Sequence, residues 1–214
     1  MPGLAAGSKI FEHIRLDKDK FEFKFLEWII PDSPDESLEH YAKRMCEKII
    51  HPNHVLVGVS FGGIIVQEMS KFIHPDKIII ISSIKNKNEI PKRLKFFQKS
   101  KLYRLFPSKK IAEINDFSKY NFTKTLKKKA ELYNKFFEVK DEKYLDWAIY
   151  NVLNWNPNYH CENLVHIHGS EDRIFPIKYI KNCIIIEGGT HAMILNKSKK
   201  INHILQEIFN NLPK

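Results

Sequence analysis

Cysteine is scarce in this sequence, whose 214 residues include only Cys46, Cys161 and Cys183. Their spacing matches neither the close pairs of a zinc site nor the framework of a disulfide-stapled secreted domain. Cys46 lies in a segment with helical spacing and Cys183 in an apolar segment typical of a strand, so we expect both to be small buried side chains. A chain without disulfides fits a reducing compartment. We therefore predict a cytoplasmic protein that holds no metal ion.

Long apolar runs are also missing. No stretch approaches the roughly 18 consecutive apolar residues that predict a membrane-spanning helix, and the first residues lack the basic-then-apolar order of a secretory signal. No nucleic-acid-binding motif is present, and the run Lys127–Lys129 is more typical of a solvated helix face. With 43% hydrophobic residues the chain can bury a sizeable core. We expect one domain, no membrane span and no nucleic-acid partner.

Arginine is rare, with 5 residues against 30 lysines, and the charge is unevenly distributed. Residues 85–155 hold 18 Lys and Arg against 8 Asp and Glu, whereas the rest of the chain holds 17 of each. A basic segment over an active site would attract anionic substrates. The Lys-, Ile- and Asn-rich composition is also that of an AT-rich coding sequence. A specific phosphate site usually uses Arg for bidentate contacts, and only Arg93 and Arg104 lie in this segment, so we favour the compositional explanation.

The most informative segment is residues 55–63, Val-Leu-Val-Gly-Val-Ser-Phe-Gly-Gly. An apolar stretch that suits a buried strand enters a G-x-S-x-G pattern centred on Ser60, and an apolar, helix-like segment follows. A serine at such a sharp strand-to-helix turn has a strained backbone, and glycine on both sides lets the neighbouring backbones approach closely. The pattern predicts that Ser60 lies near the N-terminus of a helix, where free N–H groups favour developing negative charge.

The rest of the sequence offers partners for this serine. A serine hydroxyl becomes a nucleophile when a base takes its proton, and a carboxylate must orient the base. In this kind of fold the partners follow in the order Ser, Asp or Glu, His. The apolar segment 164–169 is followed by Glu171 and Asp172, and the segment 183–187 is followed by Gly-Gly-Thr and His191. Both candidates come just beyond predicted strands, where open α/β sheets hold their functional groups.

These motifs resemble those of the α/β-hydrolase superfamily, and the resemblance runs nearly end to end. The nucleophile turn of the family matches residues 58–62, its H-G-x-x-D-x-x-x-P loop matches residues 168–176, and its G-G-x-H loop matches residues 188–191. The resemblance implies a nucleophile, acid and base at Ser60, Asp172 and His191.

The resemblance also implies an oxyanion loop, which is usually a glycine turn after an early strand. Met-Pro-Gly-Leu at residues 1–4 is similar to that loop. The backbone N–H groups of Leu4 and Phe61 would then bind the oxyanion.

Each partner has an alternative. Glu171 could replace Asp172 as the acid, although the spacing to Pro176 favours Asp172. His168, at a strand end, is expected to be structural. His191 stands apart because two glycines and a strand precede it. The remaining histidines read as solvated groups of helices and loops, and they include His13, His40, His51, His54, His74 and His203.

Alternating strand and helix patterns predict an α/β fold, with a mostly parallel sheet covered by helices on both faces. Strands are expected at residues 21–30, 55–59, 77–83, 164–169 and 183–187. Helices are expected at residues 37–50, 61–73 and 199–212.

Residues 85–155 interrupt this alternation, because they show no strand pattern and their apolar residues recur at helical spacing. By resemblance, this is where α/β-hydrolases insert a helical cap. We therefore predict three parts: residues 1–84 as the first part of the core, residues 85–155 as the cap, and residues 156–214 as the second part of the core.

One element is missing from the sequence, namely the strand that should lead into the oxyanion loop. By resemblance this strand lies between the strands at 21–30 and 55–59, and its absence would leave buried backbone groups unpaired. We expect that the N-terminal strands are missing because the true start lies upstream, with Met1 an internal methionine. Residues 1–8 should then lie beside Ser60, with a gap or repacked pairing between the two strands.

These patterns together predict a serine hydrolase that cleaves a small-molecule ester or thioester through an acyl-enzyme, with no cofactor. Two alternatives stay open: an acyltransferase with the same triad, and a non-catalytic binding protein on the same fold. A protein that only binds would be free to lose the triad. Acyl length and leaving group would depend on the cap, and the pattern is compatible with any oligomeric state.

Overall fold

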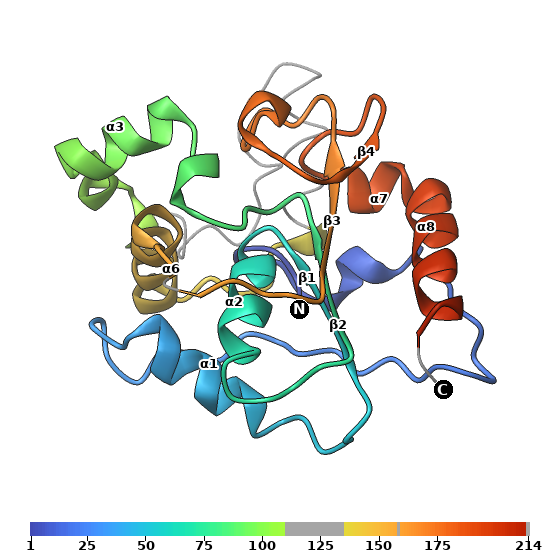
Figure 1. Cartoon of the computed structure of the whole chain (residues 1–214). Coiled ribbons are helices and arrows are strands. Elements are labelled where there is room, and N and C mark those ends of the chain that lie inside the picture. Colours follow the sequence, from blue (N-terminus) through green and yellow to red (C-terminus); the bar gives the residue numbers. More distant parts are fainter. Residues whose placement is uncertain (110–134, 158, 213–214) are drawn as a thin grey trace.

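The structure is a computed structural model that describes residues 1–109, 135–157 and 159–212. One fully parallel sheet has the order β1-β2-β3-β4 (Figure 1). Its strands are β1 (Val55–Val59), β2 (Lys77–Ile81), β3 (Leu164–Gly169) and β4 (Ile184–Ile186). Because all four run in the same direction, their carboxyl ends meet at one edge of the sheet. The predicted α/β class is confirmed.

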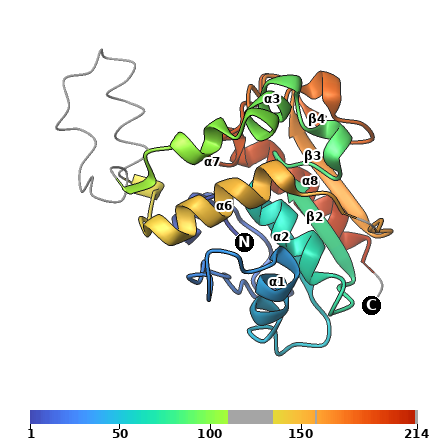
Figure 2. The same cartoon turned by 90° about the vertical axis from the view of Figure 1, so that its left-hand side faces the viewer.

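Two helical layers cover the sheet, because alternate strand residues point to opposite faces. Ile78 and Ile80 pack in a cluster with one group of helices, whereas Ile79 and Ile81 pack with the other. The first group, seen in Figures 1 and 2, is α1 (Leu38–Cys46), α2 (Phe61–Met69) and α6 (Glu142–Asn154). The second is the 3₁₀-helix η1 (Ser8–Phe11) with α7 (Met193–Asn196) and α8 (Ser198–Asn210).

The helices follow the sequence patterns closely. α1 begins after Ser37, whose Oγ accepts a hydrogen bond from the N–H of His40 at 3.1 Å and thereby caps the helix. The helix predicted at residues 61–73 is α2, which is shorter at its carboxyl end. α8 buries Ile201, Leu205 and Phe209 on the face predicted for the terminal helix.

The prediction of a strand at residues 21–30 is wrong. This segment forms no strand, and a cavity of about 950 Å³ lies between it and β1. A strand needs a neighbouring strand within hydrogen-bonding distance, and β1 lies too far away across the cavity. Near the end of the segment, a side chain replaces a neighbouring strand as the hydrogen-bond partner of the backbone: the hydroxyl of Tyr41 accepts from the N–H of Ile29 at 3.0 Å and donates to its C=O at 2.9 Å.

The N-terminal residues lie beside Ser60, as expected. The N-terminal amino group of Met1 donates to the C=O of Val57 at 2.8 Å, and the C=O of Met1 accepts from the N–H of Val59 at 3.1 Å. Within the described chain no strand precedes β1, and an isolated bridge joins Ala6 to Phe137. The expected gap beside β1 is the cavity.

The segment 85–155 contributes helices that differ in burial. It contains η2 (Lys87–Glu89), α3 (Lys92–Ser100), η3 (Leu102–Leu105) and α6. α6 packs into the core through Tyr144 and Trp147, whereas α3 has no buried residue. The division at residues 84/85 and 155/156 stays a prediction, and Lys127–Lys129 lies outside the described residues. No helix in the described ranges is both long and apolar enough to cross a membrane.

Candidate active site

Ser60 lies at the turn between β1 and α2, with φ 53° and ψ −117°. This left-handed backbone is unusual for a residue with a side chain. Two hydrogen bonds hold the turn: the N–H of Ser60 donates to the C=O of Ile81 at 2.9 Å, and Oγ of Ser83 donates to the C=O of Ser60 at 2.7 Å. The strained backbone of Ser60 is therefore held in place by β2 and by the residues that follow it.

The two glycines of the turn allow close backbone approach. A Cβ on Gly58 would lie 2.3 Å from the C=O oxygen of Gly62, and a Cβ on Gly62 would lie 2.3 Å from the C=O oxygen of Pro2. Both distances are far shorter than any real carbon–oxygen contact. The G-x-S-x-G pattern therefore has the steric cause that the sequence predicts.

His191 connects Ser60 to Asp172. It follows β4, and its Nε2 lies 3.0 Å from Oγ of Ser60 while its Nδ1 lies 2.8 Å from Oδ2 of Asp172. Because a carboxylate only accepts hydrogen bonds, Nδ1 carries the proton and Nε2 is left to accept from the serine hydroxyl. The side chain of His191 is 28% exposed, and its ring meets that of Phe175 edge-on with 5.6 Å between centroids.

Asp172 follows β3 and its side chain is fully buried. Its Oδ1 accepts from the N–H groups of Ile174 at 2.7 Å and Phe175 at 2.9 Å. Burial favours the neutral acid, but the hydrogen bond and charge of His191, together with the backbone N–H donors, prevail and lower the pKa of Asp172 below its usual value. Glu171 is exposed, and the oxygens of Asp172 occupy the position beside His191.

Leu4 and Phe61, implied as oxyanion donors, border the same turn. An added Cβ on Gly3 would lie 3.6 Å from Cβ of Ser60, so the loop containing Leu4 passes the nucleophile. The C=O of Gly3 accepts from the N–H of Ala6 at 3.0 Å and from Nε1 of Trp28 at 2.9 Å, which fixes the loop. Phe61 is the first residue of α2, where the helix itself supplies no acceptor for the N–H.

Two buried histidines lie behind Asp172. His168, expected from the sequence to be structural, has its Nε2 2.8 Å from the C=O of Phe175 and 3.5 Å from Oδ2 of Asp172. Because the carbonyl only accepts, Nε2 of His168 carries a proton. Burial lowers the pKa of His168, so its Nδ1 accepts from Nε2 of His166 at 3.0 Å. Sequence reasoning missed His166, although the spacing of two residues on one strand puts both rings on the same face.

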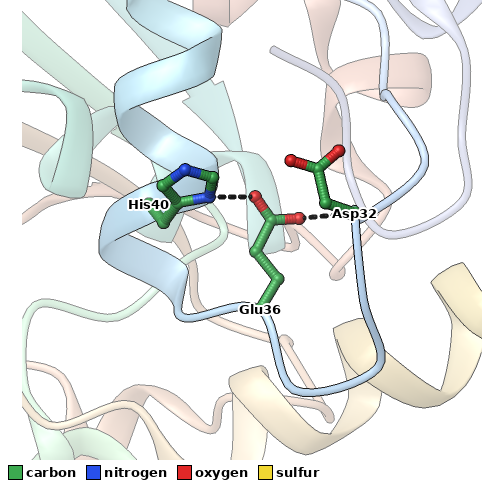
Figure 3. Close-up of side chains that lie close together, drawn as sticks. All are labelled: Asp32, Glu36 and His40. Carbon is green, nitrogen blue, oxygen red and sulfur yellow. Dashed lines mark hydrogen bonds and ion pairs between the residues drawn. The ribbon is translucent and has the colours of Figure 1, made fainter.

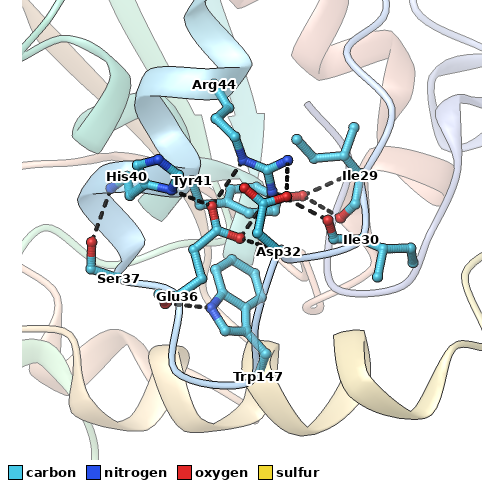
Figure 4. A network of polar contacts seen from close by, with 9 residues as sticks. All are labelled: Ile29, Ile30, Asp32, Glu36, Ser37, His40, Tyr41, Arg44 and Trp147. Carbon is cyan, nitrogen blue, oxygen red and sulfur yellow. Dashed lines mark hydrogen bonds and ion pairs between the residues drawn. The ribbon is translucent and has the colours of Figure 1, made fainter.

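One other cluster in the described chain has the composition of a metal site. Figure 3 shows Asp32, Glu36 and His40, whose ligand atoms lie within 4.8 Å of one another. The guanidinium of Arg44 forms ion pairs with both acids (Figure 4): it lies 2.8 Å from Oδ1 of Asp32 and 2.9 Å from Oε1 of Glu36. The C=O of Glu36 also accepts from Nε1 of Trp147 at 2.7 Å. The cluster is an ion-pair network that joins the start of α1 to α6.

Comparisons with known proteins agree with this architecture. An esterase of Thermogutta terrifontis has a TM-score of 0.64 at 13% identity, covering 100% of this chain and 89% of its own. A carboxylesterase of Nitrososphaera gargenis has a TM-score of 0.57 at 16% identity, covering 99% and 89%. A bromoperoxidase of Bacillus anthracis has a TM-score of 0.55 at 15% identity, covering 98% and 92%.

No protein-family model matches the chain, and no curated protein matches it in sequence. At identities this low, the solved structures establish the fold and leave the reaction to the site residues. The parallel sheet, the serine turn after β1 and the structures that superpose over nearly all of the chain lead to one conclusion: this protein has the fold of the α/β-hydrolase superfamily.

Proposed function

We propose that this protein is a serine hydrolase that cleaves a carboxylic ester or thioester through an acyl-enzyme. One observation carries the proposal: an unbroken hydrogen-bond path from Oγ of Ser60, through both ring nitrogens of His191, to buried Asp172. The path supplies a nucleophile, a base and an orienting carboxylate in the order that acyl transfer requires.

In the first half-reaction, Oγ of Ser60 attacks the substrate carbonyl while Nε2 of His191 takes the hydroxyl proton. Asp172 stabilises the positive charge that develops on the imidazole. The N–H groups of Phe61 and Leu4 donate to the oxyanion. The carbon–oxygen or carbon–sulfur bond then breaks, and His191 returns its proton to the departing alcohol or thiol.

In the second half-reaction, water attacks the acyl-enzyme. His191 takes a proton from the water, the bond to Oγ of Ser60 breaks, and the proton returns to the serine. The products are the carboxylic acid and the free enzyme. All proton transfers are carried by His191, so the proposal needs no cofactor.

The substrate is a small molecule in this proposal, and residues 85–155 form the cap that selects it. The three cysteines are free thiols. This fits a reducing compartment, so a cytoplasmic location belongs to the proposal.

A panel of p-nitrophenyl esters and acyl-thioesters of graded chain length tests the reaction. We expect saturable release of the leaving group by the wild type and none above background by Ser60→Ala. Mass spectrometry of products in the presence of an added alcohol distinguishes hydrolysis from acyl transfer to that alcohol. No turnover of any panel member, or equal turnover by Ser60→Ala, would overturn the proposal.

A further inference from the structure

The segment that contains α3 and η3 carries large apolar side chains on the outside of the protein. α3 has no buried residue, and its Phe96 and Phe97 are 62% and 44% exposed. Their rings lie edge to face with 6.4 Å between centroids. In η3 and the residue after it, three more large apolar side chains are exposed, namely Leu102, Leu105 and Phe106. A cluster of exposed apolar side chains, unlike a single one, marks an interaction surface.

The same segment is exclusively basic. Residues 92–109 contain seven Lys and Arg and no Asp or Glu. Six of these seven cations are exposed, namely Lys92, Arg93, Lys99, Lys101, Arg104 and Lys109. Among the described residues none of the seven forms an ion pair, whereas Lys71, Lys85 and Lys135 do. A Lys-rich composition accounts for the number of lysines, but it does not explain why cations without an acidic partner lie beside exposed phenylalanines.

The other side of α3 attaches the helix to the rest of the protein. In its first turn, the guanidinium of Arg93 donates to the C=O groups of Arg173 and Ile174, in the loop that also holds Asp172. In its last turn, Nε2 of Gln98 donates to Oδ1 of Asn154 in α6 at 3.3 Å. α3 and α6 lie side by side at the periphery of the molecule (Figures 1 and 2). The exposed face is therefore part of a helix that is attached at both ends, close to the candidate active site.

The residue types favour a lipid bilayer as the occupant of this face. Protein–protein interfaces are depleted of Lys, yet five of the seven cations are Lys. At a bilayer surface, Phe and Leu lie at the boundary between headgroups and acyl chains, and the long stems of Lys reach back to the headgroups. Anionic headgroups would supply the negative charge that the segment itself lacks.

We propose that this surface, the α3–η3 face, docks the protein on an anionic lipid bilayer. Its apolar members are Phe96, Phe97, Leu102, Leu105 and Phe106, and its cations are the six exposed ones. The segment would lie in the plane of the interface, with its apolar side chains in the boundary region. The proposal concerns binding alone and does not depend on the proposed reaction, so Ser60→Ala should bind vesicles as the wild type does.

Sedimentation of the full chain with sucrose-loaded vesicles measures this binding. We expect binding to vesicles of phosphatidylcholine with about 30% phosphatidylglycerol, and at least about 10-fold weaker binding to pure phosphatidylcholine. Raising the salt from about 0.1 M to about 0.5 M should weaken binding to the anionic vesicles, because salt screens the cations from the headgroups.

Substitution of the cations tests the electrostatic part. Lys92→Gln/Lys99→Gln should lower the affinity for anionic vesicles about 10-fold or more. The matched control is Lys199→Gln/Lys200→Gln, which removes the same charge from exposed positions of α8, in the other helical layer. It should change the affinity by less than about 2-fold, since its charges lie away from the docked face.

Substitution of the phenylalanines tests the apolar part. Phe96→Ala/Phe97→Ala should lower the affinity at least about 10-fold. Ile184→Ala/Ile185→Ala, at an exposed pair in β4, is the matched control and should leave the affinity unchanged. The melting temperature of each variant shows whether it is folded.

A fluorescent reporter distinguishes insertion from adsorption. Trp28, Trp147 and Trp155 are all buried, so Phe96→Trp adds an exposed indole to the docked face. Anionic vesicles whose lipids carry bromine on the acyl chains should quench the fluorescence of this variant and leave that of the wild type nearly unchanged.

Four results would overturn the proposal. The first is no vesicle binding, or equal affinity for neutral and anionic vesicles. The second is an equal loss of affinity in the α3 variants and in their controls, which would assign the binding to net charge. The third is no quenching of Phe96→Trp. The fourth is self-association or binding of single-stranded DNA, lost in Phe96→Ala/Phe97→Ala, in a protein that does not bind vesicles.

Discussion

The carboxyl end of β1 and its outer edge belong to one five-residue strand, yet their surroundings differ sharply. At the carboxyl end, the N–H, C=O and Oγ of Ser60 each have a partner within 3.0 Å. Along the outer edge, Val55 and Val57 line a cavity of about 950 Å³. The comparison shows that the loops after β1, β3 and β4 complete the geometry of the candidate site, whereas the outer side of the same strand borders a cavity.

The two regions also constrain the sequence differently. At the turn, Gly58 and Gly62 have no room for even one methyl group. At the edge, Val55 and Val57 are half-buried aliphatic residues that line the cavity. We therefore expect substitutions at the turn to affect activity and packing strongly, and substitutions at the edge to have small effects.

Ser60→Ala should give the largest effect. Loss of the nucleophile should lower kcat by on the order of 10⁶-fold. The free energy of unfolding should change little, because the hydroxyl makes no hydrogen bond that supports the turn. Steady-state kinetics and urea denaturation measure both. Loss of both fold and activity in Ser60→Ala would mean that the hydroxyl also supports the fold.

Asp172→Asn should have the next largest effect, lowering kcat by about 10⁴-fold because the amide no longer stabilises the imidazolium or fixes the tautomer of His191. The adjacent Glu171→Gln is the matched control and should leave kcat nearly unchanged. The same assay applied to both variants decides between them. A reversed ranking would move the acid to Glu171.

Gly58→Ala and Val57→Ile compare the two regions directly, because each adds carbon to neighbouring residues of β1. The alanine Cβ would meet the backbone of Gly62, so we expect a loss of about 1–3 kcal/mol or more in the free energy of unfolding. The extra methylene at Val57 should extend into the cavity that Val57 lines, and should change the free energy of unfolding little. Chemical denaturation of the two variants should separate them, and equal losses would contradict the contrast.

The pH dependence of stability should reveal the buried His166. Burial, with a smaller contribution from His168, lowers the pKa of His166 to about 2. Below pH 6.5 the imidazole of His166 therefore binds a proton in the unfolded chain and stays neutral in the folded chain. The free energy of unfolding falls as the pH falls from 6.5 toward 2. Between pH 6.5 and pH 5 the loss from this group should be about 1.6 kcal/mol.

His166→Gln is the matched variant, because it keeps a donor for Nδ1 of His168 but cannot titrate. Its unfolding free energy should fall less steeply than that of the wild type over this interval. Working above pH 5 avoids titration of Asp172, whose pKa is lowered and whose contribution is lost only at more acidic pH. Parallel pH profiles for the two proteins would show that His166 is protonated in the fold or does not stay buried.

Local sequence patterns predicted much of this structure. The turn at Ser60, the strand at Leu164–Gly169 and the terminal helix follow from glycine placement and apolar periodicity, which act within a few residues. The pairing of Asp172 with His191 was implied by resemblance, and the distances agree with it.

What the sequence missed depends on distant neighbours. The alternation at residues 21–30 suits a strand, but a strand also needs a partner edge, and the cavity of about 950 Å³ separates this segment from β1. The hydrogen bond from Ser83 to the C=O of Ser60 arises because β2 happens to end beside the turn. The second carboxyl–imidazole contact, from His168 to Asp172, arises from how the loop after β3 folds back on that strand. No local pattern contains such information.

Covalent labelling with a fluorophosphonate, followed by peptide mass mapping, tests directly whether Ser60 is an activated nucleophile. An activated serine forms a stable phosphonyl adduct, whereas an ordinary serine does not. We predict a single adduct on Ser60, no labelling of Ser60→Ala, and strongly slowed labelling of His191→Ala. A label on another residue, or labelling that persists in Ser60→Ala, would contradict the assignment of Ser60 as the nucleophile.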